Sequence, residues 1–245
     1  MLNNITLDKM RNLKLFGMLE AFEHVKQTQS LQTLSFTEGL SLLVDQEALH
    51  RDNKRLARLS KIAKLRYPQA MIEDINFEHK RAIAPELLQW LISGQWLLNQ
   101  QNILLIGPTG IGKTFLACAC ASLACRRGFN TRYFRLSKLL EAIRIAHADG
   151  SYSRLTTQLL KAQCLVIDDW GIDPITPERR ADLLEIIDDC YDQRSIIIAS
   201  QLPIDLWHDY IGDQTIADAM LDRIVHRAKI FKLMGESMRK TIASS

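Results

Sequence analysis

The fold is decided by one stretch of the chain, Ile103-Leu104-Leu105-Ile106-Gly107-Pro108-Thr109-Gly110-Ile111-Gly112-Lys113-Thr114. From Gly107 onward it matches the pattern G-x-x-x-x-G-K-[ST], and it stands between a strand-like run and a helical one, as this motif requires. The glycines let the backbone curl so that successive N–H groups converge on phosphate oxygens, and the following helix adds its positive end. We therefore predict a nucleotide-binding loop over residues 107–114, in preference to a plain glycine-rich turn.

Two side chains of this loop have expected roles. Lys113 would reach the β- and γ-phosphates of the nucleotide, and the hydroxyl of Thr114 would bind Mg²⁺. A GTP-binding protein would also need an N-K-x-D motif for guanine. The Asn-Lys pair of this chain, Asn53-Lys54, continues as Arg55-Leu56 and precedes the loop. ATP is therefore the expected nucleotide, with Mg²⁺ as its cation.

Two carboxylates follow a second apolar run, Cys164-Leu165-Val166-Ile167-Asp168-Asp169. An apolar strand that ends in Asp is the pattern in which that residue, here Asp168, completes the Mg²⁺ site beside a phosphate-binding loop. In P-loop enzymes that hydrolyse ATP, the residue after this Asp is usually a Glu that polarises the attacking water. In this chain it is Asp169. The shorter side chain is a candidate general base, with a slow ATPase as an equal alternative.

A third strand-like run, Ser195–Ala199, is followed by Ser200 and Gln201. P-loop ATPases with an additional strand place a polar residue here that orients the attacking water, so both side chains are candidate catalytic residues. The alternative is a polar strand end at the surface.

Short apolar or β-branched runs alternate with helix-length amphipathic runs from residue 103 onward. The strand-like runs are Ile103–Ile106, Arg132–Arg135, Cys164–Ile167, Ser195–Ala199 and Ile230–Leu233. Such alternation is typical of an α/β domain with a parallel sheet flanked by helices. We predict that residues 71–245 form this P-loop NTPase domain, with residues 71–100 as a connecting region.

Residues 1–70 are expected to form a small all-α domain that binds DNA or a partner. Helical spacing from Leu7 to Phe22 predicts one helix capped by Thr6, and a capping box of Ser35 and Glu38 starts a second helix that Pro68 ends. One face of the second helix carries a basic stripe: Arg51, Lys54, Arg55, Arg58 and Lys61. These side chains would contact phosphates of double-stranded DNA without sequence preference, and the alternative is a solvated amphipathic helix.

Composition limits the other classes of function. The 245 residues are 47% apolar, and 31 Lys and Arg against 28 Asp and Glu leave a net charge of +3 that names no partner. The longest apolar run, Phe115–Cys125, is shorter than the roughly 20 residues of a membrane span. The five cysteines include no C-x-x-C pair, so we expect no zinc site, a reducing compartment and a cytoplasmic protein.

In combination the motifs resemble the IstB family of insertion-sequence transposition helper ATPases, which are AAA+ proteins related to the DnaC helicase loaders. The resemblance is carried by the loop and by further segments: Asp168–Gly171, Ser200–Pro203 with Trp207, Ile211–Asp213, Asp218–His226 and Gly235–Lys240. It implies an AAA+ core that holds ATP between the subunits of a homo-oligomer on duplex DNA. It also implies that ATP is hydrolysed and that a partner transposase is stimulated or directed.

The resemblance implies roles for two arginines as well. Arg223 matches the arginine finger, which neutralises charge developing on a neighbouring subunit's γ-phosphate, with Arg227 or Arg179 as substitutes. Arg239 matches a second sensor near the C-terminus. Each has the alternative of a solvated helix arginine. The alternative functions are a DnaC-like loader of a replicative helicase and a nucleotide-binding scaffold with negligible catalysis.

Overall fold

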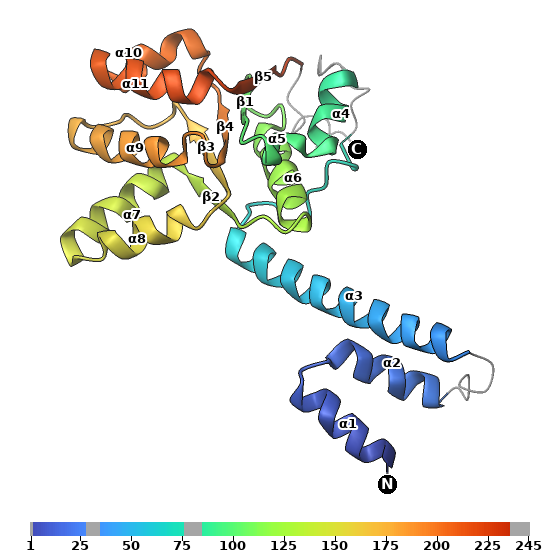
Figure 1. Ribbon diagram of the computed structural model, residues 1–245. Helices are drawn as coiled ribbons and strands as arrows, with labels where there is room; N and C mark the ends of the chain where they lie inside the picture. The colour runs from blue at the N-terminus through green and yellow to red at the C-terminus, as the bar shows by residue number, and fades with distance from the viewer. Residues whose placement is uncertain (1, 28–34, 76–84, 236–245) are drawn as a thin grey trace. The chain divides into compact units, whose positions relative to one another are not determined.

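Five parallel strands form one sheet in the computed structural model, which describes residues 2–27, 35–75 and 85–235 (Figure 1). The strands are β1 (Asn102–Ile106), β2 (Thr131–Arg135), β3 (Cys164–Trp170), β4 (Ser195–Ser200) and β5 (Ala228–Lys232). Their order is β2-β3-β4-β1-β5, and every neighbouring pair is parallel. The continuous apolar runs of β1 and β4 are wholly buried, as strands covered on both faces must be.

Helices cover both faces of this sheet (Figure 1). One face packs against α6 (Lys113–Arg126). The other packs in the larger core against α7 (Leu136–Asp149), α8 (Tyr152–Leu160), α9 (Pro177–Cys190), α10 (Trp207–Ile211) and α11 (Gln214–Val225). The short elements α4 (Pro85–Ser93) and α5 (Gln95–Leu98) precede β1, and the 3-10 turn η2 (Ile204–Leu206) precedes α10. The predicted class, a parallel sheet flanked by helices, is confirmed.

Two of the predicted strands differ from the structure by two residues or more at one end. β5 covers Ala228–Lys232 rather than Ile230–Leu233, because this edge strand pairs through residues whose side chains are mostly exposed and so lack an apolar pattern. β3 continues past its expected end at Ile167 as far as Trp170. Trp170 is fully buried, with its ring centroid 5.1 Å from that of Trp207, so packing extends the strand beyond the two carboxylates.

The residues before the sheet form α1 (Leu2–Asn12), α2 (Phe16–Gln27) and α3 (Phe36–Ala63). The prediction of one helix from Leu7 to Phe22 is wrong, because the chain turns at Lys14 with a φ of 57°. Thr6 accordingly lies inside α1 and does not cap it.

The capping box at the start of α3 is confirmed. Ser35 Oγ accepts a hydrogen bond from Glu38 N at 3.3 Å, and Glu38 Oε2 accepts one from Ser35 N at 2.8 Å. The predicted end at Pro68 is wrong: α3 stops at Ala63 because Lys64 takes a left-handed φ of 53°.

The chain divides into two compact units, Met1–Arg58 and Leu59–Ser245. The last turn of α3 belongs to the second unit, where Ala63 is buried and Arg132 Nη1 donates to Ile62 O at 3.2 Å. The domain boundary expected at residue 70 and the connecting region over 71–100 stay predictions. Within the described ranges, no helix combines the length and apolar character needed to cross a bilayer.

Glu47 of α3 holds the start of α2. Its carboxylate accepts hydrogen bonds from Gly17 N at 2.8 Å, Met18 N at 3.1 Å and Arg51 Nε at 2.6 Å. The two helices approach so closely that a Cβ on Gly17 would lie 2.4 Å from Gln46 O. Burial acts to raise the pKa of Glu47, but the hydrogen bonds outweigh burial and lower it.

We expect Glu47→Gln to destabilise the N-terminal unit by about 1–3 kcal/mol, because three donors lose a charged acceptor. Since folding lowers the pKa of Glu47, its contribution is present above the ordinary carboxyl pKa and is lost as the pH falls through the lowered value. Hydrogen exchange in α2 and α3 at neutral and acidic pH measures both effects. Asp52→Asn, an exposed change on the same helix, is the control, and equal protection in the two variants at neutral pH would contradict the role of Glu47.

Candidate nucleotide-binding site

Glycines shape the loop between β1 and α6. A Cβ on Gly107 would lie 2.4 Å from Leu233 O, because the chain after β5 crosses here and Leu233 N donates to Ile106 O at 2.7 Å. Gly110 and Gly112 have φ values of 84° and 95°, in the left-handed region that favours glycine. Pro108, Thr109 and Ile111 lie between these glycines, so the predicted loop 107–114 forms one tight curve from strand to helix.

Lys113 folds back into this curve. Its Nζ donates to Gly107 O at 2.6 Å and to Pro108 O at 2.8 Å, which leaves one of the three donor positions of the ammonium group unassigned. Burial lowers the pKa of Lys113, and the charges of Asp168 and Asp169 oppose that shift. The positive charge of Lys113 therefore lies at the point where the loop amides could bind an anion.

Thr114 and Asp168 meet as predicted from the two motifs. Thr114 Oγ1 donates to Asp168 Oδ1 at 3.1 Å, and Tyr133 Oη donates to Asp168 Oδ2 at 2.6 Å. Asp168 is 1% exposed. A hydroxyl and a carboxylate are the hard oxygen ligands that Mg²⁺ prefers, and this ion takes its remaining ligands from water and phosphates. The residues present therefore fit the expected cation.

Asp169 occupies an irregular point of β3. The register to β4 shifts between Ile167 and Trp170, and Asp169 has a φ of 60°. Burial and the charge of Asp168 raise the pKa of Asp169, opposed by Arg135, Arg66 and Lys113. Arg135 Nε lies 3.5 Å from Asp169 Oδ2. The strained backbone turns this carboxylate out of the strand's regular alternation and toward the cations of the site.

The two candidates at the end of β4, Ser200 as its last residue and Gln201 as the next, point to different partners. Ser200 is fully buried, and its hydroxyl lies 2.9 Å from Trp170 O and accepts from Leu202 N at 3.0 Å. Gln201 Oε1 instead accepts a hydrogen bond from Thr109 Oγ1 in the loop. Gln201 is therefore the residue that the structure brings to the loop, while Ser200 joins the ends of neighbouring strands.

The arginine-finger candidates all form ion pairs within the chain. Arg223 pairs with Asp188, Arg227 pairs with Asp192, and Arg179 Nη2 lies 3.7 Å from Glu141 Oε2. Asn102 Nδ2 donates to Arg223 O at 3.2 Å, which places Arg223 beside the start of β1, whereas the loop follows its end. Arg223 therefore lies at the edge of the sheet where the strands begin, whereas this chain's own loop lies at the edge where they end. Arg239 lies outside the described residues.

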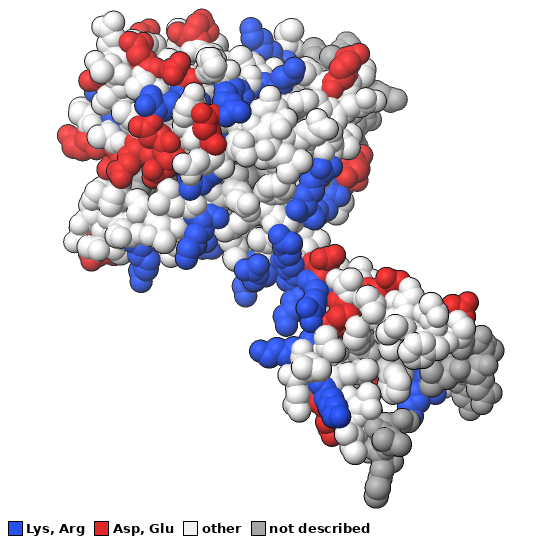
Figure 2. Space-filling model, in the orientation of Figure 1, with Lys and Arg blue, Asp and Glu red and all other residues white. Residues whose placement is uncertain are grey.

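All five residues of the basic stripe are exposed on α3, and Figure 2 shows where Lys and Arg side chains gather on one face of the molecule. The members are Arg51, Lys54, Arg55, Arg58 and Lys61. Arg51 also pairs with Glu47, and Lys54 Nζ lies 5.7 Å from the centre of the Phe16 ring. The first half of the stripe thus also helps to hold α2. This packing role is part of neither the predicted phosphate contacts nor the alternative of a solvated amphipathic helix.

Three side chains lie near the carboxylates without having been predicted there from the sequence: Tyr133, Arg135 and Arg66. Arg135 stands opposite Asp168 in the register of β2 and β3, so its place at the end of a predicted strand was an available signal. Arg66 lies over the Tyr67 ring at 5.7 Å. Burial acts to lower the pKa of Arg66, but the charges of Tyr67 and Tyr133, and then those of Asp168 and Asp169, outweigh burial and raise it. No sequence pattern links residue 66 to these carboxylates.

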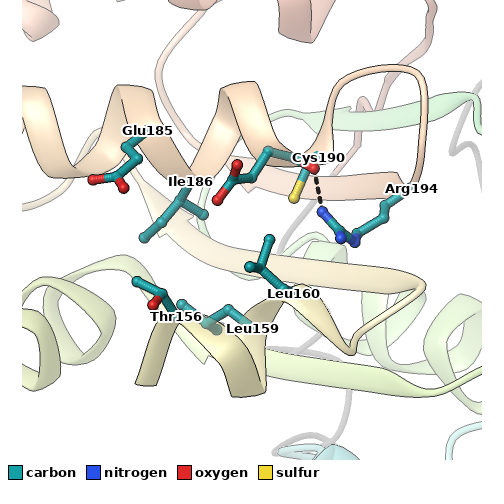
Figure 3. A pocket seen from close by; sticks show the side chains of 8 residues that line it. Thr156, Leu159, Leu160, Glu185, Ile186, Cys190 and Arg194 are labelled. Atoms are coloured by element: carbon teal, nitrogen blue, oxygen red, sulfur yellow. Dashed lines mark hydrogen bonds between the residues drawn. The ribbon is translucent and has the colours of Figure 1, made fainter. Parts of the chain in front are cut away.

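A hollow away from the loop lies between α8 and α9, with a cavity volume of only about 10 Å³ (Figure 3). Leu159 and Leu160 face Ile186 across it, and Arg194 donates to Asp189 O beside Cys190. Burial raises the pKa of Cys190 to about 11, so its thiol stays protonated. The hollow is smaller than usual ligand pockets and contains none of the predicted site residues.

Residues 8–245 match the family described as IstB-like ATP binding protein. The chain belongs to this family. An insertion-sequence ATP-binding protein of Sinorhizobium fredii is 42% identical over 240 residues, 98% of each chain. The insertion sequence IS1162 ATP-binding protein of Pseudomonas fluorescens is 45% identical over 203 residues, 83% of this chain and 88% of that one. The resemblance to the IstB family is confirmed.

The core of this IstB-like chain is similar to solved replication proteins. The DnaC helicase loader matches with a TM-score of 0.57 at 17% identity, covering 69% of this chain and 99% of that one. AMPPCP-bound DnaA from Aquifex aeolicus matches with a TM-score of 0.56 at 18% identity, covering 72% and 54%. Identities this low show the fold alone, and that fold agrees with the predicted parallel sheet flanked by helices.

We expect Gly107→Ala to destabilise the core by about 1–3 kcal/mol, because the added methyl meets the backbone oxygen of Leu233 rather than a flexible side chain. Urea unfolding measures the change. Gly39→Ala is the matched control: nothing lies within 4 Å of its added Cβ, and alanine favours the helix by about 0.5–1 kcal/mol. If the two variants were equally stable, the close crossing at Gly107 would not exist.

Proposed function

We propose that this protein is an ATP-dependent transposition helper that assembles as a homo-oligomer on duplex DNA and stimulates or directs a partner transposase. It binds ATP with Mg²⁺ in the loop 107–114, at the interface between subunits, and hydrolyses ATP to ADP and phosphate. The observation that carries the proposal is the meeting of Lys113, Thr114 and Asp168 at the end of the sheet. The relatives at 42% and 45% identity, which are named for insertion sequences, support the biological setting.

Binding rests on the loop and the two oxygen ligands. The loop amides and the start of α6 would hold the phosphates, and Lys113 would exchange its contacts to loop carbonyls for phosphate oxygens. Thr114 and Asp168 would hold Mg²⁺, which neutralises charge and acts as a Lewis acid at the phosphates. AMPPCP in the structure of DnaA, a protein of the same fold, agrees with a nucleotide at this loop.

Hydrolysis would use Asp169 as the general base. Asp169 would take a proton from a water molecule whose oxygen bonds to the γ-phosphorus, while the bond from that phosphorus to the β–γ bridging oxygen breaks. Gln201, held beside the loop by Thr109, would orient the water. Ser200 would contribute only by holding the ends of β3 and β4 together.

Oligomerisation would complete the site. Arg223 lies at the edge of the sheet opposite its own loop, so it is available to a neighbouring subunit's nucleotide once it leaves Asp188. There a guanidinium would neutralise charge developing on the γ-phosphate, with Arg227 or Arg179 as substitutes and Arg239 as a second sensor.

DNA binding would use the basic stripe of α3. Its exposed side chains can neutralise phosphates, which releases counterions and gives strongly salt-dependent affinity without base recognition. The alternative function is that of a replicative helicase loader.

The similarity to the DnaC helicase loader supports this alternative only through the shared fold. Pull-down of the full chain against a transposase and a replicative helicase separates the two functions. Unchanged phosphate release by Asp169→Asn would instead favour a scaffold without catalysis.

Lys113→Ala should weaken ATP binding at least about ten-fold and abolish ATP-dependent assembly on DNA, because charge-assisted contacts to the phosphates are lost. Isothermal titration measures the affinity, and electron microscopy with duplex DNA shows the assembly. Lys161→Ala, which removes an exposed lysine at the end of α8, is the control. Full nucleotide affinity in the Lys113 variant would refute the assignment of the loop.

Replacing Arg55, Arg58 and Lys61 together with Ala should reduce the slope of log affinity against log salt by about 3, if each residue neutralises one phosphate. Fluorescence anisotropy with duplexes of two unrelated sequences measures it, and both should weaken equally. The control replaces Lys26, Arg154 and Lys161, which are exposed on other helices and carry the same charge. Equal slopes for the two triple variants would exclude α3 as the DNA-binding face.

A further inference from the structure

Tyr133 contacts the carboxylate at the centre of the proposed site. It lies on β2, which is paired with β3 so that Tyr133 stands opposite Val166 and Arg135 opposite Asp168. The side chain reaches diagonally along β3, and Tyr133 Oη donates to Asp168 Oδ2 at 2.6 Å. This length is typical of a strong hydrogen bond from a hydroxyl to a charged carboxylate.

Both oxygens of Asp168 are thereby bound by protein hydroxyls. Thr114 Oγ1 holds Oδ1 from the loop side, and Tyr133 holds Oδ2 from the neighbouring strand. At 1% exposure the carboxylate has almost no contact with bulk water, so rotating it would break two hydrogen bonds in a buried setting. The plane of the carboxylate is therefore fixed.

The hydroxyl of Tyr133 is a hydrogen-bond donor near neutral pH. A phenol ionises only at about pH 10, so it keeps its proton at neutral pH and donates it to the carboxylate of Asp168.

We propose that Tyr133 is a positioning residue for the cation that accompanies the nucleotide. By holding Asp168 Oδ2, it keeps Oδ1 at Thr114 Oγ1, so that the two cation ligands are set before the cation arrives. The inference rests on the proposed binding of ATP with Mg²⁺. Partners that orient metal ligands in this way typically change metal affinity by about 10–100-fold when they are removed.

A purely structural role for Tyr133, as an anchor of β2 to β3, has a different consequence. Loss of such an anchor would disturb the loop itself and weaken nucleotide binding equally with and without Mg²⁺. Loss of a positioning residue weakens only the part of the affinity that depends on Mg²⁺. The two roles are therefore separated by the coupling between the cation and the nucleotide.

The test is Tyr133→Phe, which keeps the ring and removes only the hydroxyl. Titration calorimetry with a non-hydrolysable ATP analogue measures its affinity in excess Mg²⁺ and in EDTA, and titration of MgCl₂ into the EDTA-free nucleotide complex measures the half-saturating Mg²⁺ concentration. We expect this concentration to rise about ten-fold or more, while the affinity in EDTA stays within about two-fold of the wild type. That second value also shows that the loop of the variant is folded.

The matched control is Tyr152→Phe. Tyr152 Oη donates to Glu185 Oε2 at 2.6 Å, a tyrosine–carboxylate contact of the same length, but it is exposed and joins α8 to α9 away from the loop. It should leave both nucleotide affinity and Mg²⁺ dependence unchanged. If Tyr133→Phe behaves like this control, or binds Mg²⁺ more tightly, or loses affinity equally in EDTA, the inference is overturned and the proposed function stands. A wild-type chain that binds no nucleotide, or binds it without regard to Mg²⁺, overturns both.

Discussion

The buried carboxylate of Asp168 is the point on which the site depends. Asp168 lies near the carboxyl end of β3. It accepts hydrogen bonds from Thr114 at the start of α6 and from Tyr133 on β2. A carboxylate held at 1% exposure without these donors would be strongly disfavoured, so the three elements must meet. Loop, edge strand and central strand are thus assembled by one charged group that also suits a divalent cation.

The parallel sheet explains why such a meeting occurs at this edge. All five strands run in one direction, so the loop after β1, the carboxylates of β3 and Gln201 after β4 emerge together. The same polarity sends Arg223 to the other edge, beside the start of β1. An arginine at that edge lies away from its own loop, which is why we propose that it acts at the nucleotide of a neighbouring subunit.

The N-terminal unit uses a related device for a different purpose. Glu47 accepts from the first amides of α2 and from Arg51, so a buried carboxylate again joins separate elements. Because Arg51 belongs to the basic stripe, one residue contributes both to helix packing and to the exposed charge of α3. Changes at the amino end of the stripe are therefore expected to affect folding as well as the proposed phosphate contacts, while Arg58 and Lys61 lie farther along the helix.

The sequence by itself determined the parallel α/β core, because continuous apolar strands alternating with amphipathic helices have few other ways to bury their surface. It also determined the loop and the pairing of Thr114 with Asp168, since the ends of parallel strands share an edge. Only the tertiary structure decided which polar residue at the end of β4 reaches the loop, because Ser200 and Gln201 differ by a single step of the strand's alternation. The same holds for Tyr133, Arg66 and the break at Lys14. Their contacts join residues distant in the chain or depend on one dihedral angle, and local patterns of hydrophobicity carry no record of either.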